Sequence, residues 1–228
     1  MTHAKKIPAH IRFAALAVDG VAFAFIDGVL HVRTAEVQSE AFRGMRGFPG
    51  GMIHADETAE QALVRIMREK AAVTESYSEQ LYTFSRIDRD PRGRVVAVAY
   101  LLLVNPVCAQ EIAKDACGVH KASWTPLSKA KKFAYDHDEV LVVALERLRA
   151  KIAYTDLMRH LMPKEFTLTE LQSAFESILG RGLDKRNFRK KVLALNLVEG
   201  TSKKTKGGAF RPAELYRFGK RIGEVEIF

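Results

Sequence analysis

A glycine-rich segment followed by an amphipathic helix constrains the fold of this 228-residue chain more than any other feature. The segment runs from Gly44 to Gly51 and ends in Gly47-Phe-Pro-Gly-Gly51. Thr58 is a natural N-cap, because its hydroxyl can accept a hydrogen bond from a free N–H of the first helical turn. Apolar residues then recur with the helical period, at Ala62, Leu63, Ile66, Met67 and Val73. The pattern predicts a glycine turn that leads into a helix with one buried face.

Apolar runs on both sides of this segment predict strands, so the first two thirds of the chain should mix strands and helices. Asp19-Gly20 and Asp27-Gly28 have the composition of tight hairpin turns. The expected strands are 13–18, 21–26, 29–33, 81–86, 94–104 and 121–124, and a helix is expected at 138–151.

The spacing after Gly51 resembles the Nudix box, Gly-x5-Glu-x7-Arg-Glu-U-x-Glu-Glu-x-Gly-U, where U is aliphatic. Six of its nine specified positions match, at Gly51, Glu57, Arg65, Met67, Glu69 and Val73. The resemblance implies the Nudix fold, an α/β/α sandwich with a mixed sheet. The three departures are Ile66, Lys70 and Ala72.

Two of these departures change the chemistry of the helix. Positions 66, 69 and 70 share one helical face, because they are three and four residues apart. In Nudix hydrolases, glutamates at all three positions hold Mg²⁺ against a diphosphate, whereas this face carries Ile66, Glu69 and Lys70. A hard divalent cation needs several oxygen ligands, so we expect no metal site, no cofactor and no catalytic residue here. Lys70 could instead favour an anionic ligand without a metal.

A polar turn between two predicted strands, residues 88–94, carries three arginines. Guanidinium groups suit a diphosphate because they offer paired hydrogen-bond donors. A turn that is simply exposed to solvent explains the composition equally well. The predicted ligand-binding residues are Gly50, Gly51, Glu57, Arg65, Glu69, Arg89, Arg92 and Arg94.

The last third of the chain is basic. Residues 151–228 contain 16 Lys and Arg against 9 Asp and Glu, whereas residues 1–150 contain 20 and 18. Short helices are expected at 155–161, 168–179 and 184–195, followed by a hairpin of 197–200 and 214–218. Three helices and a hairpin form the order of a winged helix. We therefore predict an α+β protein of two domains, in which residues 1–150 bind an effector and residues 151–228 form a winged helix-turn-helix that binds DNA.

The third of these helices has the properties of a DNA-recognition helix. Phe188, Val192 and Leu195 would face the core, while Arg186 and Lys190 point the opposite way. A basic, amide-bearing face suits the major groove, and a basic hairpin tip suits phosphates. A merely solvated basic face is the alternative. The predicted DNA contacts are Lys185, Arg186, Asn187, Arg189, Lys190, Lys191, Lys203, Lys204, Lys206 and Arg211.

Together the two halves resemble the NrtR family, the Nudix-related transcriptional regulators of NAD metabolism. The resemblance covers residues 10–218, and the segments that carry it are 79–100, 166–172, 184–191 and 211–218. It implies a homodimeric repressor that binds a palindromic operator in double-stranded DNA. It also implies a nucleotide effector such as ADP-ribose, which binds in the Nudix pocket and weakens DNA binding.

Two other functions compete with this interpretation. A hydrolase of ADP-ribose, or of a related nucleoside diphosphate derivative, would keep the Nudix frame and its Glu57 and Glu69. An RNA-binding adaptor ranks lower, because the tail lacks the paired aromatic residues that stack on single-stranded bases.

The cellular compartment follows from simple features. Cys108 and Cys117 have no paired spacing and fit a reducing environment. The longest apolar run, 95–104, is shorter than the ~18–20 residues of a membrane helix, and the N-terminus resembles no secretory signal. We therefore expect a cytoplasmic protein with no membrane partner.

Overall fold

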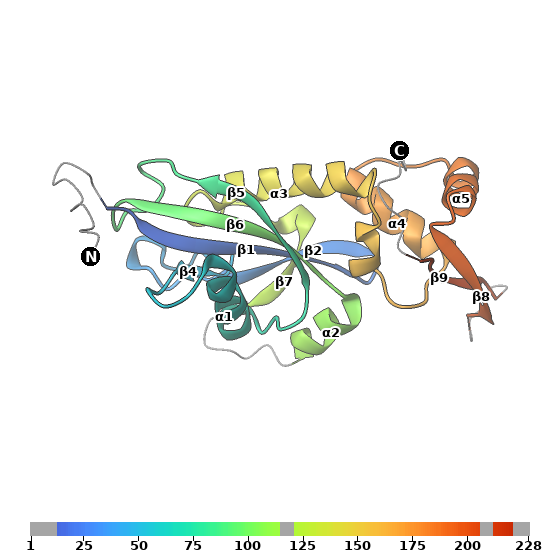
Figure 1. The fold of residues 1–228 in the computed structure, drawn as a ribbon, viewed down its shortest axis with the longest axis horizontal. Coiled ribbons are helices and arrows are strands. Elements are labelled where there is room, and N and C mark those ends of the chain that lie inside the picture. Colours follow the sequence, from blue (N-terminus) through green and yellow to red (C-terminus); the bar gives the residue numbers. More distant parts are fainter. Residues whose placement is uncertain (1–12, 115–120, 206–211, 221–228) are drawn as a thin grey trace, which may run out of the picture.

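The computed structural model describes residues 13–114, 121–205 and 212–220. A sheet with its covering helices forms one end of the elongated molecule, and a smaller part built from helices and a hairpin forms the other (Figure 1).

Within the described ranges, a seven-stranded mixed sheet occupies the N-terminal part. Five strands lie in the order β3-β2-β1-β6-β5, while β4 pairs with β1 and β7 pairs with β2. β1 runs parallel to β6, and the other pairs within the sheet are antiparallel. The strands are β1 (Ala15–Ile26), β2 (Val29–Glu36), β3 (Arg46–Gly47), β4 (Gly50–Met52), β5 (Tyr77–Phe84), β6 (Val95–Val104) and β7 (Ser123–Pro126).

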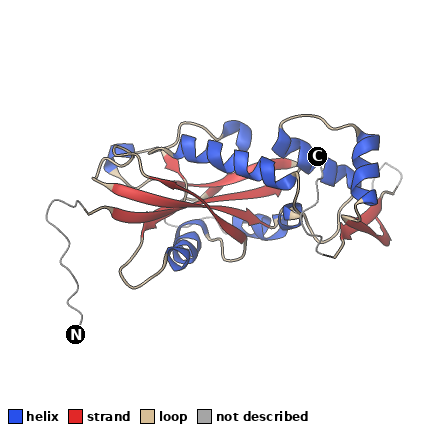
Figure 2. Ribbon diagram, turned by 45° about the horizontal axis from the view of Figure 1, so that its top comes forward, coloured by secondary structure: helices blue, strands red, loops and turns tan. Residues whose placement is uncertain are grey.

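Helices cover both faces of this sheet, as Figure 2 shows. Successive side chains of β1 point to opposite faces. Val18 and Ala22 belong to the core that packs with α1 (Ala59–Ala71) and α2 (Pro106–Lys114). Val21 and Phe23 belong to the core that packs with α3 (His137–Ile152). Short 3-10 helices, η1 (Glu40–Phe42) and η2 (Leu127–Lys129), lie in the loops. The predicted α/β/α sandwich with a mixed sheet is confirmed.

The turn expected at Asp19-Gly20 is wrong, because both residues lie inside the unbroken strand β1. Ten residues of β1 pair with β6, so the strand continues past this point. The Asp19 carboxylate forms a buried ion pair with Arg89 instead of reaching solvent. Gly20 allows close packing, since a Cβ there would lie 2.4 Å from the Met67 Sδ of α1. The other pair, Asp27-Gly28, does form the expected turn, with φ of 50° and 81°.

Helix α1 begins where Thr58 predicts. Gln61 N–H donates to Thr58 Oγ1 and Thr58 N–H donates to Gln61 Oε1, which together form a capping box. The helix ends at Ala71, and its C-cap residue Ala72 has a φ of 56°, which lies in the left-handed region. The Nudix box has glycine at this position, which adopts that conformation without the steric cost of a Cβ.

The C-terminal part has the predicted winged-helix order. Its elements are η3 (Leu157–His160), α4 (Leu168–Leu179), α5 (Lys185–Ala194), β8 (Val198–Lys204) and β9 (Glu214–Phe218). Thr167 and Glu170 form a capping box at the start of α4. The first expected helix, 155–161, is reduced to the short η3, and the other two agree with the prediction within one residue at each end.

Helix α3 leads from the sheet into the C-terminal part (Figure 1). One hydrophobic cluster joins the two, from Phe23 in β1 to Phe175 in α4 and Phe188 in α5. Arg149 Nε of α3 also donates to the carbonyl of Ile178 at 2.8 Å. The two parts thus share a core, and the boundary at residue 150 stays a prediction.

Some expectations concern residues outside the described ranges, namely Cys117, Lys206 and Arg211. Cys108 is half-buried and has a free thiol. In the described ranges, no helix combines the length and the apolarity needed to cross a membrane.

Candidate functional site

A cavity of about 640 Å³ opens beside β1 and β4. Half of the predicted ligand-binding residues line it, namely Gly50, Gly51, Arg89 and Arg92. The loop at 36–41, together with Lys70, Tyr135 and His137, completes much of its wall. The other predicted residues lie outside the lining: Glu57, Arg65, Glu69 and Arg94.

Gly50 brings the backbone of β4 close to a carboxylate of β1. A Cβ at Gly50 would lie 2.1 Å from Asp19 Oδ1 and 3.0 Å from the carbonyl oxygen of Val18. Because neither neighbour can move without disturbing the sheet, this position requires glycine.

Arg89 anchors a buried polar network beside the cavity. Its Nε and Nη2 donate to the Asp136 carboxylate at 2.9 and 2.8 Å, and Nη2 also donates to Asp19 at 3.1 Å. Burial lowers the pKa of Arg89, but the hydrogen bonds to Asp136 and the charge of Asp19 outweigh it and leave the pKa raised. Arg89 therefore ties the 88–94 turn to β1 and to the start of α3.

His137 belongs to the same network and lies in the cavity wall. The Phe48 N–H donates to His137 Nδ1 at 2.9 Å, so the proton of the neutral ring is assigned to Nε2, which faces Asp19 Oδ1 at 3.7 Å. Burial lowers the pKa of His137. A neutral imidazole thus completes the network at neutral pH.

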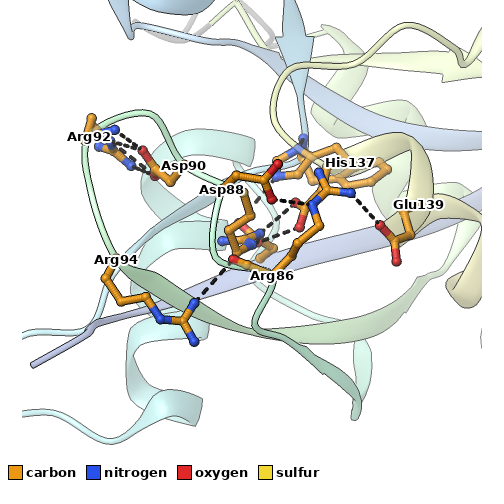
Figure 3. Close-up of polar contacts among 11 residues, drawn as sticks. Arg86, Asp88, Asp90, Arg92, Arg94, His137 and Glu139 are labelled. Carbon is orange, nitrogen blue, oxygen red and sulfur yellow. Dashed lines mark hydrogen bonds and ion pairs between the residues drawn. The ribbon is translucent and has the colours of Figure 1, made fainter. Parts of the chain in front are cut away.

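The other two arginines of the turn make separate contacts (Figure 3). Arg92 Nε and Nη2 donate to the Asp90 carboxylate at 2.9 and 2.6 Å, and the guanidinium lies 5.9 Å from the Tyr135 ring centre. Arg94 Nη1 donates to the carbonyls of Ser85 and Arg86 at 2.8 and 3.2 Å. Arg94 therefore closes the turn on itself.

Glu57 and Arg65 form an ion pair that fixes the loop before α1. Arg65 Nε donates to Glu57 at 2.9 Å, and Arg65 Nη2 donates both to Glu57 and to the carbonyl of Met52. The hydrogen bond from Arg65 is the main reason that the pKa of Glu57 falls to about 2. Glu69 lies 3.7 Å from Arg65 and is half-exposed. These residues hold the Nudix-box segment together outside the cavity.

The side chains at positions 66, 69 and 70 of α1 do not fit the Mg²⁺ site that the Nudix fold implies. Ile66 is fully buried, and Lys70 Nζ donates to the carbonyl of Gly50 at 2.7 Å. Of the three positions that carry glutamate in Nudix hydrolases, Glu69 alone supplies a carboxylate. Within the described part of the chain, no group of three or more His, Cys, Asp or Glu could hold a metal ion.

Asp19 is the main cavity residue that the sequence reasoning missed. Its charge interrupts an apolar run, which is a signal of a buried polar site, but the following glycine suggested a turn. Lys70 and Tyr135 also line the cavity without having been included in the predicted ligand set. The loop at 36–41 contains no motif that would have singled it out.

Helix α5 presents a basic face to solvent from a firmly packed base. Phe188 and Val192 are buried, and Phe188 packs edge-on against Phe175 at 5.6 Å. Asp184 caps the helix by accepting a hydrogen bond from the Asn187 N–H at 2.8 Å. The exposed residues of the predicted set are Lys185, Arg186, Asn187, Lys190 and Lys191.

The other predicted DNA contacts that lie in the described ranges differ in their exposure and in their side-chain partners. Arg189 is half-buried and donates to Thr169 Oγ1 at 3.1 Å. On β8, Lys203 pairs with Glu165 at 2.6 Å, and Lys204 is exposed. Helix α5 and β8 lie at the same end of the molecule (Figure 1), so their exposed lysines and arginine lie on neighbouring elements.

Comparisons with known proteins match both parts of the chain. Residues 15–144 match the model of the NUDIX domain, and residues 158–218 match that of the NrtR DNA-binding winged helix domain. The ADPR responsive transcriptional repressor NtrR of Acinetobacter baylyi is 34% identical over 207 residues, which are 89% of this chain and 81% of that protein.

Two solved structures extend these similarities. The crystal structure of Shewanella oneidensis NrtR complexed with a 27mer DNA has a TM-score of 0.77 at 34% identity, covering 90% of this chain and 93% of that one. The NUDIX domain of the same protein complexed with ADP ribose has a TM-score of 0.53 at 31% identity, covering 65% of this chain and 99% of that one.

Proposed function

The chain belongs to the NrtR family of Nudix-related transcriptional regulators, and on this premise we propose that it is a repressor controlled by ADP-ribose. It joins a Nudix domain to a DNA-binding winged helix. The cavity beside β1 and β4 receives the nucleotide, and α5 enters the major groove of the operator. The relatives from Acinetobacter baylyi and Shewanella oneidensis support both partners.

The exposed basic face of α5 is the observation that carries the DNA-binding half of this proposal. Arg186, Asn187 and Lys190 are exposed, while Phe188 and Val192 hold the helix to the core. Arginine and asparagine make paired hydrogen bonds to guanine and adenine edges, and lysine neutralises phosphates. A firmly packed base and an exposed polar face together suit readout of the groove.

The protein acts as a homodimer in this proposal. Two copies of α5 enter successive major grooves about one helical turn, ~34 Å, apart, which explains a palindromic operator. Because a transcriptional regulator must reach the DNA, we place this protein in the cytoplasm.

Helix α3 is suited to link the cavity to the DNA-binding part. At its start, Asp136 binds Arg89, and towards its end Arg149 donates to the C-terminal turn of α4. A ligand that favours one position of α3 would favour one spacing of the two recognition helices. The ligand can shift this equilibrium only by its difference in affinity for the two states.

The Nudix domain has lost efficient hydrolysis in this proposal. Glu57 and Glu69 are the features that favour the alternative, an ADP-ribose hydrolase. Glu57 is bound by Arg65, however, and Glu69 shares its helical face with Ile66 and Lys70, which supply no carboxylate. One carboxylate beside an ammonium is a poor ligand set for a hard divalent cation.

Fluorescence anisotropy with duplex DNA from upstream of the protein's own gene tests the proposal. We expect tight binding that ADP-ribose weakens, and NAD serves as the comparison ligand. Arg186→Ala should weaken binding to this duplex by roughly 5- to 150-fold, since a good base contact contributes about 1–3 kcal/mol. Binding that ADP-ribose leaves unchanged would refute the effector, and equal affinity of Arg186→Ala would remove α5 from the interface.

A further inference from the structure

The carboxylates that line the cavity have their charges balanced by neighbouring cations. Among the described residues, four carboxylates line the cavity, and each lies within 4 Å of an arginine or lysine nitrogen, in the pairs Asp19–Arg89, Glu36–Lys121, Glu40–Arg43 and Asp90–Arg92. Arg89 binds Asp136 as well. An anionic ligand therefore meets few free charges of either sign from these residues.

Lys70 differs from the two arginines of the lining. Its Nζ donates to the carbonyl of Gly50 at 2.7 Å, and no ion pair with a carboxylate is formed by it within the described part of the chain. Its side chain is half-buried, so water solvates the ammonium only in part. Gly51 leaves room for the Lys70 ammonium, since a Cβ at position 51 would lie 3.4 Å from Lys70 Nζ.

We propose that the Lys70 ammonium takes the place of the Nudix divalent cation and binds the diphosphate of the nucleotide directly, so that ADP-ribose binds without a metal. This inference rests on the proposed function, in which an ADP-ribose-like nucleotide enters the cavity. An ammonium has three N–H donors, and Gly50 accepts from one, which leaves two for phosphate oxygens. The attraction is strengthened where part of the surrounding water is excluded.

Replacement of the metal by the Lys70 ammonium explains how the site can still bind a diphosphate after hydrolysis has been lost. An ammonium neutralises part of the phosphate charge, as a metal does. It does not carry a bound water of lowered pKa that could attack the diphosphate. The Lys70 substitution therefore keeps the recognition of the diphosphate and removes the means of cleaving it.

Isothermal titration calorimetry of the full chain with ADP-ribose tests this inference, with one titration in EDTA and one in Mg²⁺. We expect equal affinity in the two buffers. Lys70→Met should weaken binding at least tenfold in both, because hydrogen bonds to charged groups contribute about 1.5–3 kcal/mol. Lys70→Arg should keep affinity within a few-fold. Arg68→Met, an exposed charge loss on the same helix, is the matched control and should bind normally.

The outcomes separate this inference from the proposed function. No binding of ADP-ribose by the wild-type chain in either buffer would refute the effector itself. Binding that needs Mg²⁺, or equal affinities of Lys70→Met and Arg68→Met, would overturn the role of Lys70 alone. Thermal melting of each variant verifies its fold, and Lys70→Gln replaces Lys70→Met if the latter does not fold.

Discussion

Arg89 binds both oxygens of the Asp136 carboxylate, at 2.9 and 2.8 Å, across 47 residues of sequence. The pair joins the 88–94 turn to the N-terminus of α3, at the edge of the cavity. Its geometry is the fork-to-fork arrangement that makes an arginine–carboxylate pair specific. One contact thus connects the ligand site to the helix that leads into the DNA-binding part.

Arg89→Met should destabilise the protein strongly. It leaves the buried carboxylates of Asp19 and Asp136 without their shared cation, and breaking such a pair costs about 3–5 kcal/mol. Differential scanning fluorimetry should show a fall in Tm of about 10 °C. Arg94→Met, which loses only backbone contacts at an exposed site, should shift Tm by much less. Similar shifts in the two variants would contradict the role of the buried network.

Stability should fall as the pH drops from 6.5 to 5, and His137 should be a main cause. Burial lowers the pKa of His137 in the folded state, so between that pKa and 6.5 the unfolded state binds more protons. The free energy of unfolding must then decrease with decreasing pH in this window. The charged groups that face His137 are Asp19, Asp136, Arg89 and Asp138.

Urea unfolding at several pH values measures this effect. The variant His137→Gln, which can still accept the Phe48 hydrogen bond, should lose most of the dependence between pH 5 and 6.5. An unchanged slope in His137→Gln would assign the acid sensitivity to other groups.

Ala72→Gly should stabilise the protein, although glycine usually weakens helices. Ala72 is exposed and has φ of 56°, a conformation that costs a residue with a Cβ about 1 kcal/mol. The opposite result is expected for Ala150→Gly in α3, where the backbone is helical and glycine costs about 1 kcal/mol. Chemical denaturation of both variants measures the change in the free energy of unfolding, which should be positive for Ala72→Gly and negative for Ala150→Gly. A loss of stability in Ala72→Gly would show that the left-handed residue is not strained.

Lys190→Ala should weaken DNA binding for all sequences alike. A lysine that neutralises one phosphate releases about one counterion, so its loss should lower the slope of log K against log salt by about 1. Anisotropy titrations over a range of KCl concentrations measure that slope. Lys129→Ala, an exposed lysine in the sheet part, should leave the slope unchanged. An unchanged slope in Lys190→Ala would place Lys190 away from the phosphates.

The sequence predicts local elements well where their ends carry strong signals. Helix α4 has the predicted bounds, because Thr167 caps its start and Gly180 adopts the left-handed φ of 69° at its end. The turn predicted at Asp19-Gly20 is wrong because long-range contacts outweigh the local signal there. Its local turn composition is overridden by pairing with β6, about 80 residues away, and by the ion pair with Arg89.

The candidate ligand site was predictable in part. The glycines of the Nudix box and the arginines of the 88–94 turn indicated the region, and Gly50, Gly51, Arg89 and Arg92 do line the cavity. Sequence spacing could not predict the hydrogen bonds from Arg89 to Asp136 and from Lys70 Nζ to the Gly50 carbonyl, because both join distant segments of the chain. Such pairings depend on the packing of the whole sheet.

A time course of DNA release in the presence of Mg²⁺ tests the central claim, that this Nudix domain senses ADP-ribose without consuming it. Labelled operator is bound by the protein, a small excess of ADP-ribose is added, and anisotropy is followed for hours. We predict release that persists unchanged, with ADP-ribose recovered intact at the end. Release followed by rebinding, as AMP and ribose 5-phosphate accumulate, would show a working hydrolase and contradict the account.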